Sequence, residues 1–365
     1  MSIVIFIIIL AVLIIVHEYG HFIVAKKGGI RVDEFGLGYP PRAKTLFKRK
    51  GTLFTLNWLP FGGFVKIFGE NPDDESLNGE FKANAFVNKP KWLQALVLFA
   101  GPFMNFLFAW IIILVSLWIG LPTSLNETMN PNFIKDKSTI VTNVLTDSPA
   151  YNSGITTGDV IVDIKVDGVS NTLNDSSDLR NIVKEKQNSE FEIIYSRAGE
   201  NFTIKIKPDY FNNNEEKLLG LGVTNFGIYK PNFITGFLDS FKFTGVMISS
   251  ITLALFDLIK GLFVGGADIS SLTGPIGIVS MVGDASKMGI VYILSFTAII
   301  SINLGVINLI PFPALDGGRL FFLLIEKIKG GRVNSNFLNW VNFVGFSLLI
   351  ILMIYVSYKD ILRLV

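Results

Sequence analysis

Long apolar runs alternate along the chain with polar, turn-rich stretches. Three runs are long enough and carry little enough charge to cross a bilayer as helices: about Ile3–Ala25, about Trp92–Gly120 and about Phe337–Tyr358. A fourth run, about Gly289–Ile310, precedes the last of these in the chain and would be the third span. It contains serine and asparagine residues, which at that depth should face protein rather than lipid. The pattern predicts a polytopic α-helical membrane protein with about four spans.

A further apolar segment, Phe233–Val264, is interrupted by two aspartates and two lysines. We expect it to form amphipathic helices that lie on the membrane surface or pack on the core. Two crossings within this segment are also compatible with the sequence.

Basic residues gather in two of the loops between the spans. Eight lysines and arginines lie between Lys26 and Lys50, and four lie between Arg319 and Arg332. Because positive charge marks the cytoplasmic side of a membrane protein, both loops are predicted to be cytoplasmic. The N-terminus and residues 121–231 are then expected outside.

The two long connections have structure of their own. In the first, Val32–Gly38 and Thr52–Lys66 alternate between apolar and polar residues, which predicts a β-hairpin. Its segment Leu59–Val65 is apolar and can dip into the membrane only where protein satisfies its backbone groups. In the second, residues about 138–208 predict an inserted α/β domain, and Leu219–Val223 could add a final strand. The expected elements of this domain are strands at Thr139–Val144, Val160–Val166, Glu190–Ser196 and Phe202–Lys207 and a helix near Ser177–Lys186. The predicted organisation is residues 1–25, first span; 26–91, cytoplasmic loop with a membrane-associated β-hairpin; 92–120, second span; 121–231, external segment; 232–288, amphipathic or peripheral helices; 289–336, third span and cytoplasmic loop; 337–365, fourth span and tail.

Only two histidines occur in the chain, and both stand in the first apolar run. His17, Glu18 and His21 form the pattern H-E-x-x-H. A spacing of four residues places both imidazoles on one helical face, where they can hold one metal ion. Glu18 lies about 100° further round the helix. It could therefore reach a water acidified by the metal and act as a general base without being a ligand.

Two less specific explanations of this run are weaker. The motif arises by chance in soluble helices, but ionisable groups inside a membrane span are costly and usually functional. The run could also be a signal peptide, yet it has no basic start and no convincing small-residue cleavage site before Lys26. We therefore expect a retained first span.

Composition narrows the chemistry further. Half of the 365 residues are hydrophobic and 32 are phenylalanine, which fits a membrane protein. A net charge of +2 implies no nucleic-acid partner. Since the chain has no cysteine, disulfides, thiolate ligands and cysteine nucleophiles are excluded, and a metal must be held by His, Asp or Glu.

Asp316 is the natural third ligand. It follows the fourth apolar run and is the only acidic residue between Asp284 and Glu326. With two histidines it would complete a His-His-Asp site with room for water. Alternatively, Asp316 could cap the helix that begins near Gly318.

The direction of the spans tests this assignment. His17, His21 and Asp316 lie toward the C-terminal ends of their spans, so these ends meet only if both spans run the same way. Zero or two crossings between the second span and Gly289 allow this, whereas a single crossing in Phe233–Val264 would put Asp316 on the wrong side.

Three segments together resemble a known family. His17–Phe22, Phe99–Phe106 and Asn303–Arg319 resemble the site-2 proteases, and specifically the bacterial RseP-type intramembrane zinc metalloproteases. The resemblance covers nearly the whole chain, and the paired H-E-x-x-H and L-D-G motifs are highly specific.

The resemblance implies roles for individual residues. His17, His21 and Asp316 would bind Zn²⁺, Glu18 would be the base, and Asn308 would position substrate or the developing oxyanion. The family's membrane-associated hairpin, which would hold an unwound substrate, corresponds to Gly62, Gly63, Phe64 and Val65, followed by Lys66.

The external domain also has a counterpart in the family. Residues 148–168 resemble part of a PDZ domain in its circularly permuted bacterial form, although no literal Gly-Leu-Gly-Phe loop is present. The segment has room for one such domain, whereas enterobacterial members carry two. By resemblance, this domain could bind peptide C-termini.

The expected function is intramembrane proteolysis in the bacterial inner membrane. Substrates would be single-span membrane proteins already trimmed outside, including anti-sigma factors and remnant signal peptides. The active site would open toward the cytoplasm, and the protein's other contact would be membrane lipid. A transporter would explain the spans but not H-E-x-x-H, and a catalytically dead scaffold would be expected to lack Glu18 or a ligand.

Overall fold

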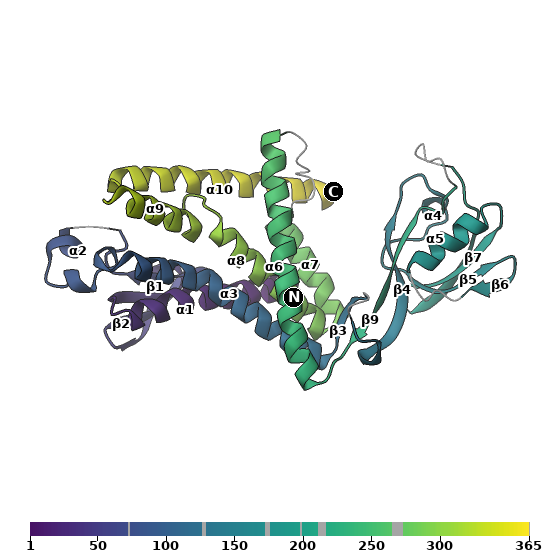
Figure 1. Ribbon diagram of the computed structural model, residues 1–365, viewed down its shortest axis with the longest axis horizontal. Helices are drawn as coiled ribbons and strands as arrows, with labels where there is room; N and C mark the ends of the chain where they lie inside the picture. The colour runs from purple at the N-terminus through teal and green to yellow at the C-terminus, as the bar shows by residue number, and fades with distance from the viewer. Residues whose placement is uncertain are drawn as a thin grey trace. The chain divides into compact units, whose positions relative to one another are not determined.

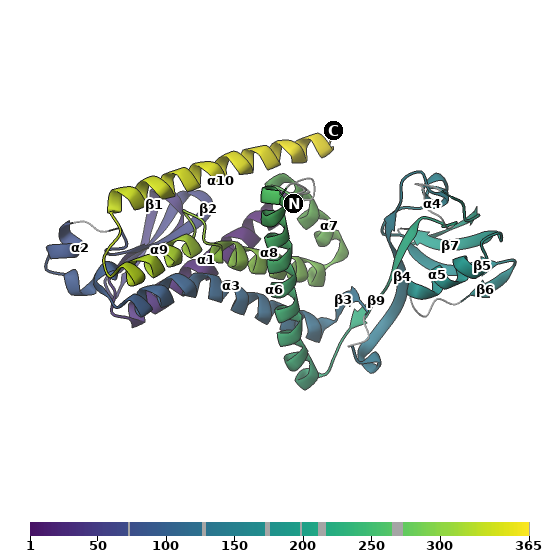
Figure 2. The same cartoon turned by 45° about the horizontal axis from the view of Figure 1, so that its top comes forward.

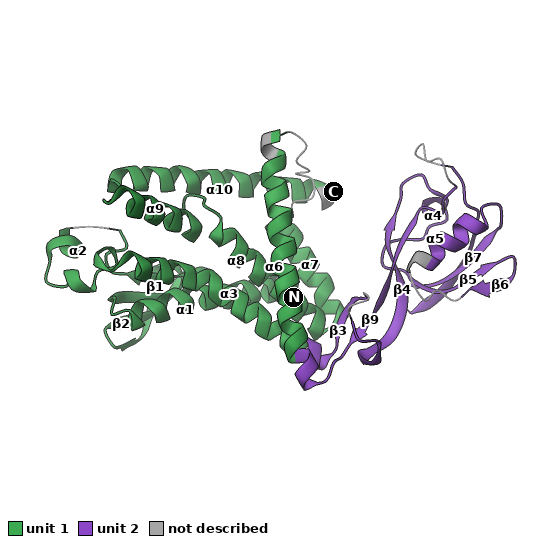
Figure 3. Cartoon of the chain, viewed as in Figure 1, with its two compact units in different colours: residues 1–116, 237–365 green, residues 117–236 purple. Residues whose placement is uncertain are grey.

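The computed structural model describes residues 1–71, 74–125, 129–171, 176–197, 199–210, 217–264 and 273–364. The chain divides into two compact units (Figure 3). Unit 1 comprises Met1–Ser116 and Phe237–Val365, and unit 2 comprises Leu117–Gly236.

Unit 1 is built mainly from long apolar helices (Figure 1). Five helices are long and apolar enough to cross a membrane: α1 (Ser2–Lys27), α3 (Lys91–Ile119), α6 (Phe233–Val264, of which residues 233–261 qualify), α8 (Ile290–Leu309) and α10 (Ser335–Leu364, of which residues 335–362 qualify). The expectation of a polytopic helical membrane protein is thereby supported. Shorter elements are α2 (Asp74–Asn78), α7 (Pro275–Met288), α9 (Asp316–Lys329) and two 3₁₀ turns, Lys82–Asn84 and Phe86–Asn88.

Helix α6 is where structure and expectation differ most. The sequence predicted amphipathic helices over Phe233–Val264, but the segment is one continuous helix, so there are five candidate spans rather than about four. The interrupting charges are too widely spaced to lower its hydropathy below that of a span. In two views, however, α6 runs across the direction of α3 and α10 rather than along it (Figures 1 and 2).

Helices α7 and α10 of unit 1 join at an aspartate near the C-terminal end of α10. The Asp360 side chain is almost fully buried and accepts hydrogen bonds from the backbone N–H groups of Gly274 and Gly277. Both glycines precede or begin α7, whose free N–H groups and dipole favour a carboxylate there. On its other side α7 packs against α1, where Val282 joins a core cluster with Ile9 and Leu13.

The loop after α1 forms an antiparallel sheet of β1 (Val32–Arg49) and β2 (Thr52–Ile67), as the alternation predicted. Each strand bends near a proline, so the sheet contains four paired segments. Residues 34–37 of β1 pair with residues 53–56 on one side and residues 63–66 on the other. Residues 63–66 therefore form an edge of the sheet, and β2 packs on α1.

Unit 2 contains a seven-stranded sheet with the order β3-β9-β4-β5-β7-β8, in which β6 pairs with β5. The predicted strands and helix recur within a few residues of their expected bounds. The sequence did not indicate β3 or β6, and β9 continues well beyond the strand proposed at Leu219–Val223. The elements are β3 (Leu121–Ser124), a 3₁₀ turn (Pro131–Phe133), β4 (Ile134–Val144), α4 (Pro149–Asn152), β5 (Val160–Val166), β6 (Val169–Asn171), α5 (Ser176–Glu185), β7 (Phe191–Arg197), β8 (Glu200–Ile206) and β9 (Leu221–Tyr229).

Unit 2 has its own apolar core. Leu179 and Val183 of α5 pack against sheet residues such as Ile164, Phe191 and Ile193, each of which is buried. A core of this kind, built from both helix and sheet, gives the segment the properties of an independent domain.

Candidate metal centre

The two histidines lie where α1 packs against α3. Their spacing of four residues brings the imidazoles onto one face of α1, with ring centroids 4.9 Å apart. His21 is buried and His17 is half-buried. The helices can approach closely because Gly20 has no side chain: a Cβ there would lie 2.2 Å from the carbonyl oxygen of Ala100.

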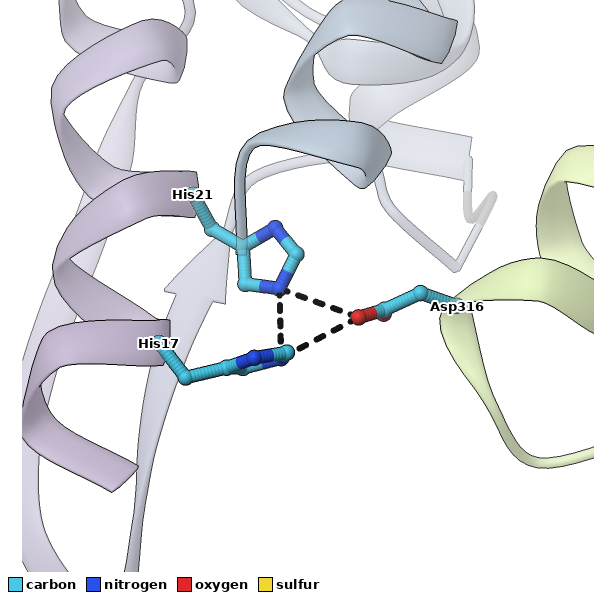
Figure 4. A group of neighbouring side chains, drawn as sticks. All are labelled: His17, His21 and Asp316. Carbon is cyan, nitrogen blue, oxygen red and sulfur yellow. Dashed lines mark hydrogen bonds and ion pairs between the residues drawn. The ribbon is translucent and has the colours of Figure 1, made fainter. Parts of the chain in front are cut away.

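Three ligand atoms converge at this point (Figure 4). Nε2 of His17 lies 3.1 Å from Oδ2 of Asp316 and 3.2 Å from Nε2 of His21, and the third side of the triangle is 3.4 Å. Zinc binds such atoms at about 2.0–2.1 Å in a tetrahedron, which separates neighbouring ligands by roughly 3.3–3.4 Å. The triangle therefore fits one zinc ion to within about 0.2 Å, with the fourth vertex free.

Asp316 reaches the histidines from the start of α9. The preceding loop turns sharply at Ala314, which has a left-handed φ of 71°. Gly317 and Gly318 then pack against backbone, since a Cβ on either would lie 2.2 Å from a carbonyl oxygen. Leu315, not Asp316, is the N-cap residue of α9, and the Asp316 carboxylate faces the histidines. The geometry thus favours the ligand interpretation over the capping one.

The charge state of Asp316 suits a ligand. Burial by itself would raise the pKa of this carboxyl, but hydrogen bonds and charge from His17 and His21 outweigh it and lower the pKa to about 2. The side chain is therefore an ionised, electron-donating carboxylate at neutral pH.

Helix α3 contacts the Nδ1 atoms of both imidazoles, which are the ring nitrogens that do not face Asp316. Nδ1 of His21 lies 2.8 Å from the carbonyl oxygen of Val97, and Nδ1 of His17 lies 3.2 Å from Nδ2 of Asn105. Gly101 lies midway between Val97 and Asn105 in the sequence, and because the three residues are four apart they share one face of α3. A Cβ on Gly101 would lie 2.3 Å from Nε2 of His21 and 2.8 Å from Nε2 of His17.

We expect Gly101→Ala to lower zinc affinity about ten-fold or more, because the added methyl group displaces both ligand atoms from their positions. Zinc per mole of purified protein, measured at a series of chelator concentrations, gives the result. Gly245→Ala is the matched control, since it also adds a methyl group to a helical glycine but meets open space. Unchanged zinc binding by Gly101→Ala would contradict the geometry.

Glu18 and the predicted substrate-binding residues line one cavity with the three ligands. Its volume is about 440 Å³, and its polar lining includes the carboxamide of Asn308 near the end of α8. The Glu18 carboxylate forms a hydrogen bond with the backbone of Val65 in β2. Gly63 of β2 lies beside Glu18, since a Cβ there would be in van der Waals contact with the Glu18 side chain, at 3.7 Å. All the residues predicted from sequence line this cavity: His17, Glu18, His21, Gly62, Gly63, Phe64, Val65, Asn308 and Asp316.

Four polar lining residues carry no role in the sequence interpretation: Tyr39, Glu70, Asn105 and Arg319. Arg319 forms an ion pair with Glu70 at the cavity wall. Asn105 gave a signal in the sequence, as a polar residue inside an otherwise apolar span. Of the other three, Glu70 lies in a loop, Arg319 in the first turn of α9 and Tyr39 within β1, where polar residues are ordinary.

Comparison with known proteins agrees with this geometry. The profile of the family described as Peptidase family M50 matches residues 5–352. The chain belongs to peptidase family M50. This match spans both the H-E-x-x-H helix and Asp316, and it confirms the resemblance to site-2 proteases.

Relatives of this M50 chain carry matching descriptions. A Clostridium perfringens protein named as a zinc metalloprotease is 36% identical over 356 residues, covering 96% of this chain and 95% of its own. The regulator of sigma-W protease RasP of Bacillus subtilis is 28% identical over 440 residues, covering 100% of this chain and 99% of its own. A Fusobacterium nucleatum protein, also named as a zinc metalloprotease, is 31% identical over 370 residues, covering 100% of this chain and 99% of its own. The predictions of a zinc metalloprotease and of Zn²⁺ as its cofactor are confirmed.

Proposed function

We propose that this M50 protease cleaves the transmembrane segments of single-span membrane proteins. The observation that carries the proposal is that His17 and His21 lie on α1, an apolar helix long enough to span a bilayer, and that Asp316 meets them there. A peptide bond brought to that point would lie inside or at the edge of the membrane, away from soluble substrates.

Residues of the cavity divide the chemistry between them. Zinc, held by His17, His21 and Asp316, would polarise the scissile carbonyl and acidify a water molecule. The Glu18 carboxylate accepts the proton of the attacking water and later passes it to the leaving amine. The Asn308 carboxamide donates a hydrogen bond to the developing oxyanion, where preorganised donors are most effective.

A transmembrane helix must unwind before it can be cut, because its carbonyl groups are engaged in helical hydrogen bonds. The edge of the sheet at Gly62–Val65 supports an unwound substrate. One side of this segment pairs with β1, which leaves its other backbone groups available to an added strand. Since Gly63 lies beside Glu18, such a strand would pass the catalytic residues.

Unit 2 is proposed to act as a PDZ-like domain on the external side. It has a groove of about 510 Å³ lined by α5, the start of β9 and the preceding glycine turn. On one edge, residues 221–224 of β9 pair with β4, whereas β3 covers the other edge only at residues 226–229. Among the described strands, nothing pairs with that second edge at residues 221–224, where an extended peptide C-terminus could add.

A segment that lines this groove could replace the Gly-Leu-Gly-Phe loop that the sequence lacks. Gly220 has a left-handed φ of 79° and lines the groove with the three residues that follow it. In this proposal Gly220-Leu221-Gly222-Val223 takes the role of a Gly-Leu-Gly-Phe loop, with valine for phenylalanine. The sequence interpretation treated this stretch only as a strand.

The natural setting follows from the same features. The apolar helices and the RasP relatives place the chain in the class of multi-pass bacterial membrane proteins. In this proposal the metal centre opens to the cytoplasm and unit 2 lies outside, as the distribution of basic residues predicts. Anti-sigma factors and remnant signal peptides are the proposed substrates.

Two substrates that share one transmembrane segment test both parts of the proposal. One retains a folded external domain and the other ends a few residues outside the membrane. We expect reconstituted wild-type protein to cut the trimmed substrate within its apolar segment, as read from fragment masses, and to leave the intact one. A variant lacking residues 138–208 should cut both. Cutting outside the apolar segment would contradict intramembrane proteolysis, and loss of activity on both substrates by a folded deletion variant would contradict a gating role for unit 2.

A further inference from the structure

Asn105 of α3 has a buried polar atom without a partner. Its side chain is fully buried, and among the described residues Oδ1 accepts no hydrogen bond. The other end of the same carboxamide, Nδ2, lies 3.2 Å from Nδ1 of His17. An unsatisfied buried acceptor is destabilising and calls for an explanation.

The protonation of His17 makes this contact unfavourable as placed. Nε2 of His17 faces Asp316 and His21, so a neutral His17 that binds metal does so through Nε2. Its single proton must then be on Nδ1. Nδ1–H would therefore point at the NH₂ group of Asn105, placing two donors against each other, while a free acceptor lies on the same carboxamide.

Exchanging the two ends of the carboxamide removes the conflict between the two donors. Oδ1 and Nδ2 occupy almost the same space, so the exchange needs no movement of α3. Oδ1 then accepts the hydrogen bond from Nδ1–H of His17, and the NH₂ group takes the position in which Oδ1 had no partner.

We propose that Asn105 is a positioning residue for the metal centre, holding His17 through an Nδ1–H···Oδ1 hydrogen bond. This bond fixes the tautomer that leaves the Nε2 lone pair free for metal, and it also fixes the ring plane. The inference rests on the proposed assignment of His17 as a ligand.

The other histidine supports this arrangement independently. Nδ1 of His21 lies 2.8 Å from the carbonyl oxygen of Val97, which can only accept, so His21 donates from Nδ1 and also offers Nε2 to the metal. Val97 and Asn105 lie two turns apart on one face of α3, on either side of Gly101. Helix α3 thus supplies one hydrogen-bond acceptor to each imidazole. Gly101, which has no side chain, leaves room for the two rings.

Substitutions at Asn105 separate this role from simpler ones. Asn105→Leu keeps the size and shape but has no acceptor, whereas Asn105→Asp keeps the acceptor as a carboxylate. If Asn105 serves only to fill space, leucine should be tolerated and a buried aspartate should not. If Asn105 instead donates from Nδ2, both variants should fail alike. Only the acceptor role predicts that aspartate preserves zinc binding and leucine does not.

Zinc affinity of the full-length protein in detergent, measured by competition with a chelator, tests the proposal without relying on activity. We expect Asn105→Leu to bind zinc 10–100-fold more weakly, as is typical when the partner of a metal-binding histidine is lost, and Asn105→Asp to stay within about three-fold of wild type. Ser116→Ala, at another buried polar residue of α3 without a hydrogen-bond partner, is the control and should bind zinc as wild type does.

Each other outcome is decisive. Wild-type affinity in Asn105→Leu, or equal losses in the leucine and aspartate variants, would overturn the role of Asn105 and leave the metal centre intact. Wild-type protein that binds no zinc would overturn the metal centre and this inference together. If Asn105→Leu does not elute as folded protein in size-exclusion chromatography, Asn105→Val takes its place in the same comparison.

Discussion

Replacing Glu18 by glutamine should slow cleavage of a transmembrane substrate by about 10²–10⁴-fold, the usual cost of losing a general base. The amide has the shape of the carboxylate but cannot accept a proton. Zinc binding should be almost unchanged, since Glu18 is not among the three converging ligands. The rate is measured with purified, reconstituted protein and a single-span substrate, and zinc is determined on the same samples.

Glu75→Gln is the matched control for this experiment. Glu75 belongs to the same unit, its side chain is 62% exposed, and it is not part of the cavity lining. Near-normal turnover by Glu18→Gln would rule out Glu18 as the base, while parallel loss of zinc would make it a ligand.

Asp316→Asn should lower both zinc occupancy and cleavage. The loss in zinc affinity should be at least about 10–100-fold, which is typical when only a residue that hydrogen-bonds a metal ligand is lost. The carboxylate oxygen that completes the triangle with His17 and His21 becomes part of a neutral amide. The affinity is measured by chelator competition, and the cleavage rate is measured after saturation with zinc.

Asp284→Asn controls for the removal of one negative charge. Asp284 is exposed and pairs with Lys287 on α7, away from the ligands, so neither zinc nor activity should change. If Asp316→Asn keeps its zinc but loses stability, the role of Asp316 would be structural and the capping interpretation would return.

Much of this arrangement was predictable from local pattern. The period of apolar residues gives helices and strands, and the i, i+4 spacing of His17 and His21 fixes their common face before any tertiary contact forms. The same reasoning located β5 at Val160–Val166 and helix α5 at Ser176–Glu185 to within a residue or two. It was less successful for β3, a four-residue strand whose identity comes from pairing with β9 rather than from alternation.

The expected division of α6 into several helices was wrong for a different reason. Charges on the segment Phe233–Val264 suggested a broken, amphipathic structure, yet helix formation depends on backbone hydrogen bonds that four scattered charged residues do not disrupt. Whether such a helix crosses or lies along a membrane depends on its packing partners. In unit 1 these include Trp110 of α3, which bonds to Ser240 and stacks on Phe241.

The sequence by itself determined the donor atoms of the candidate metal centre, the helical face that carries two of them, and the apolar residues that surround them. Only the tertiary structure brought Asp316 to the histidines across 299 residues, and only it revealed Gly101 and Asn105 behind them. The reason is physical. Residue spacing determines direction within one helix, but contact between helices depends on how closely their backbones approach. Glycines at positions 20, 101, 317 and 318 permit that approach here, and their effect can be seen only once the facing atoms are in place.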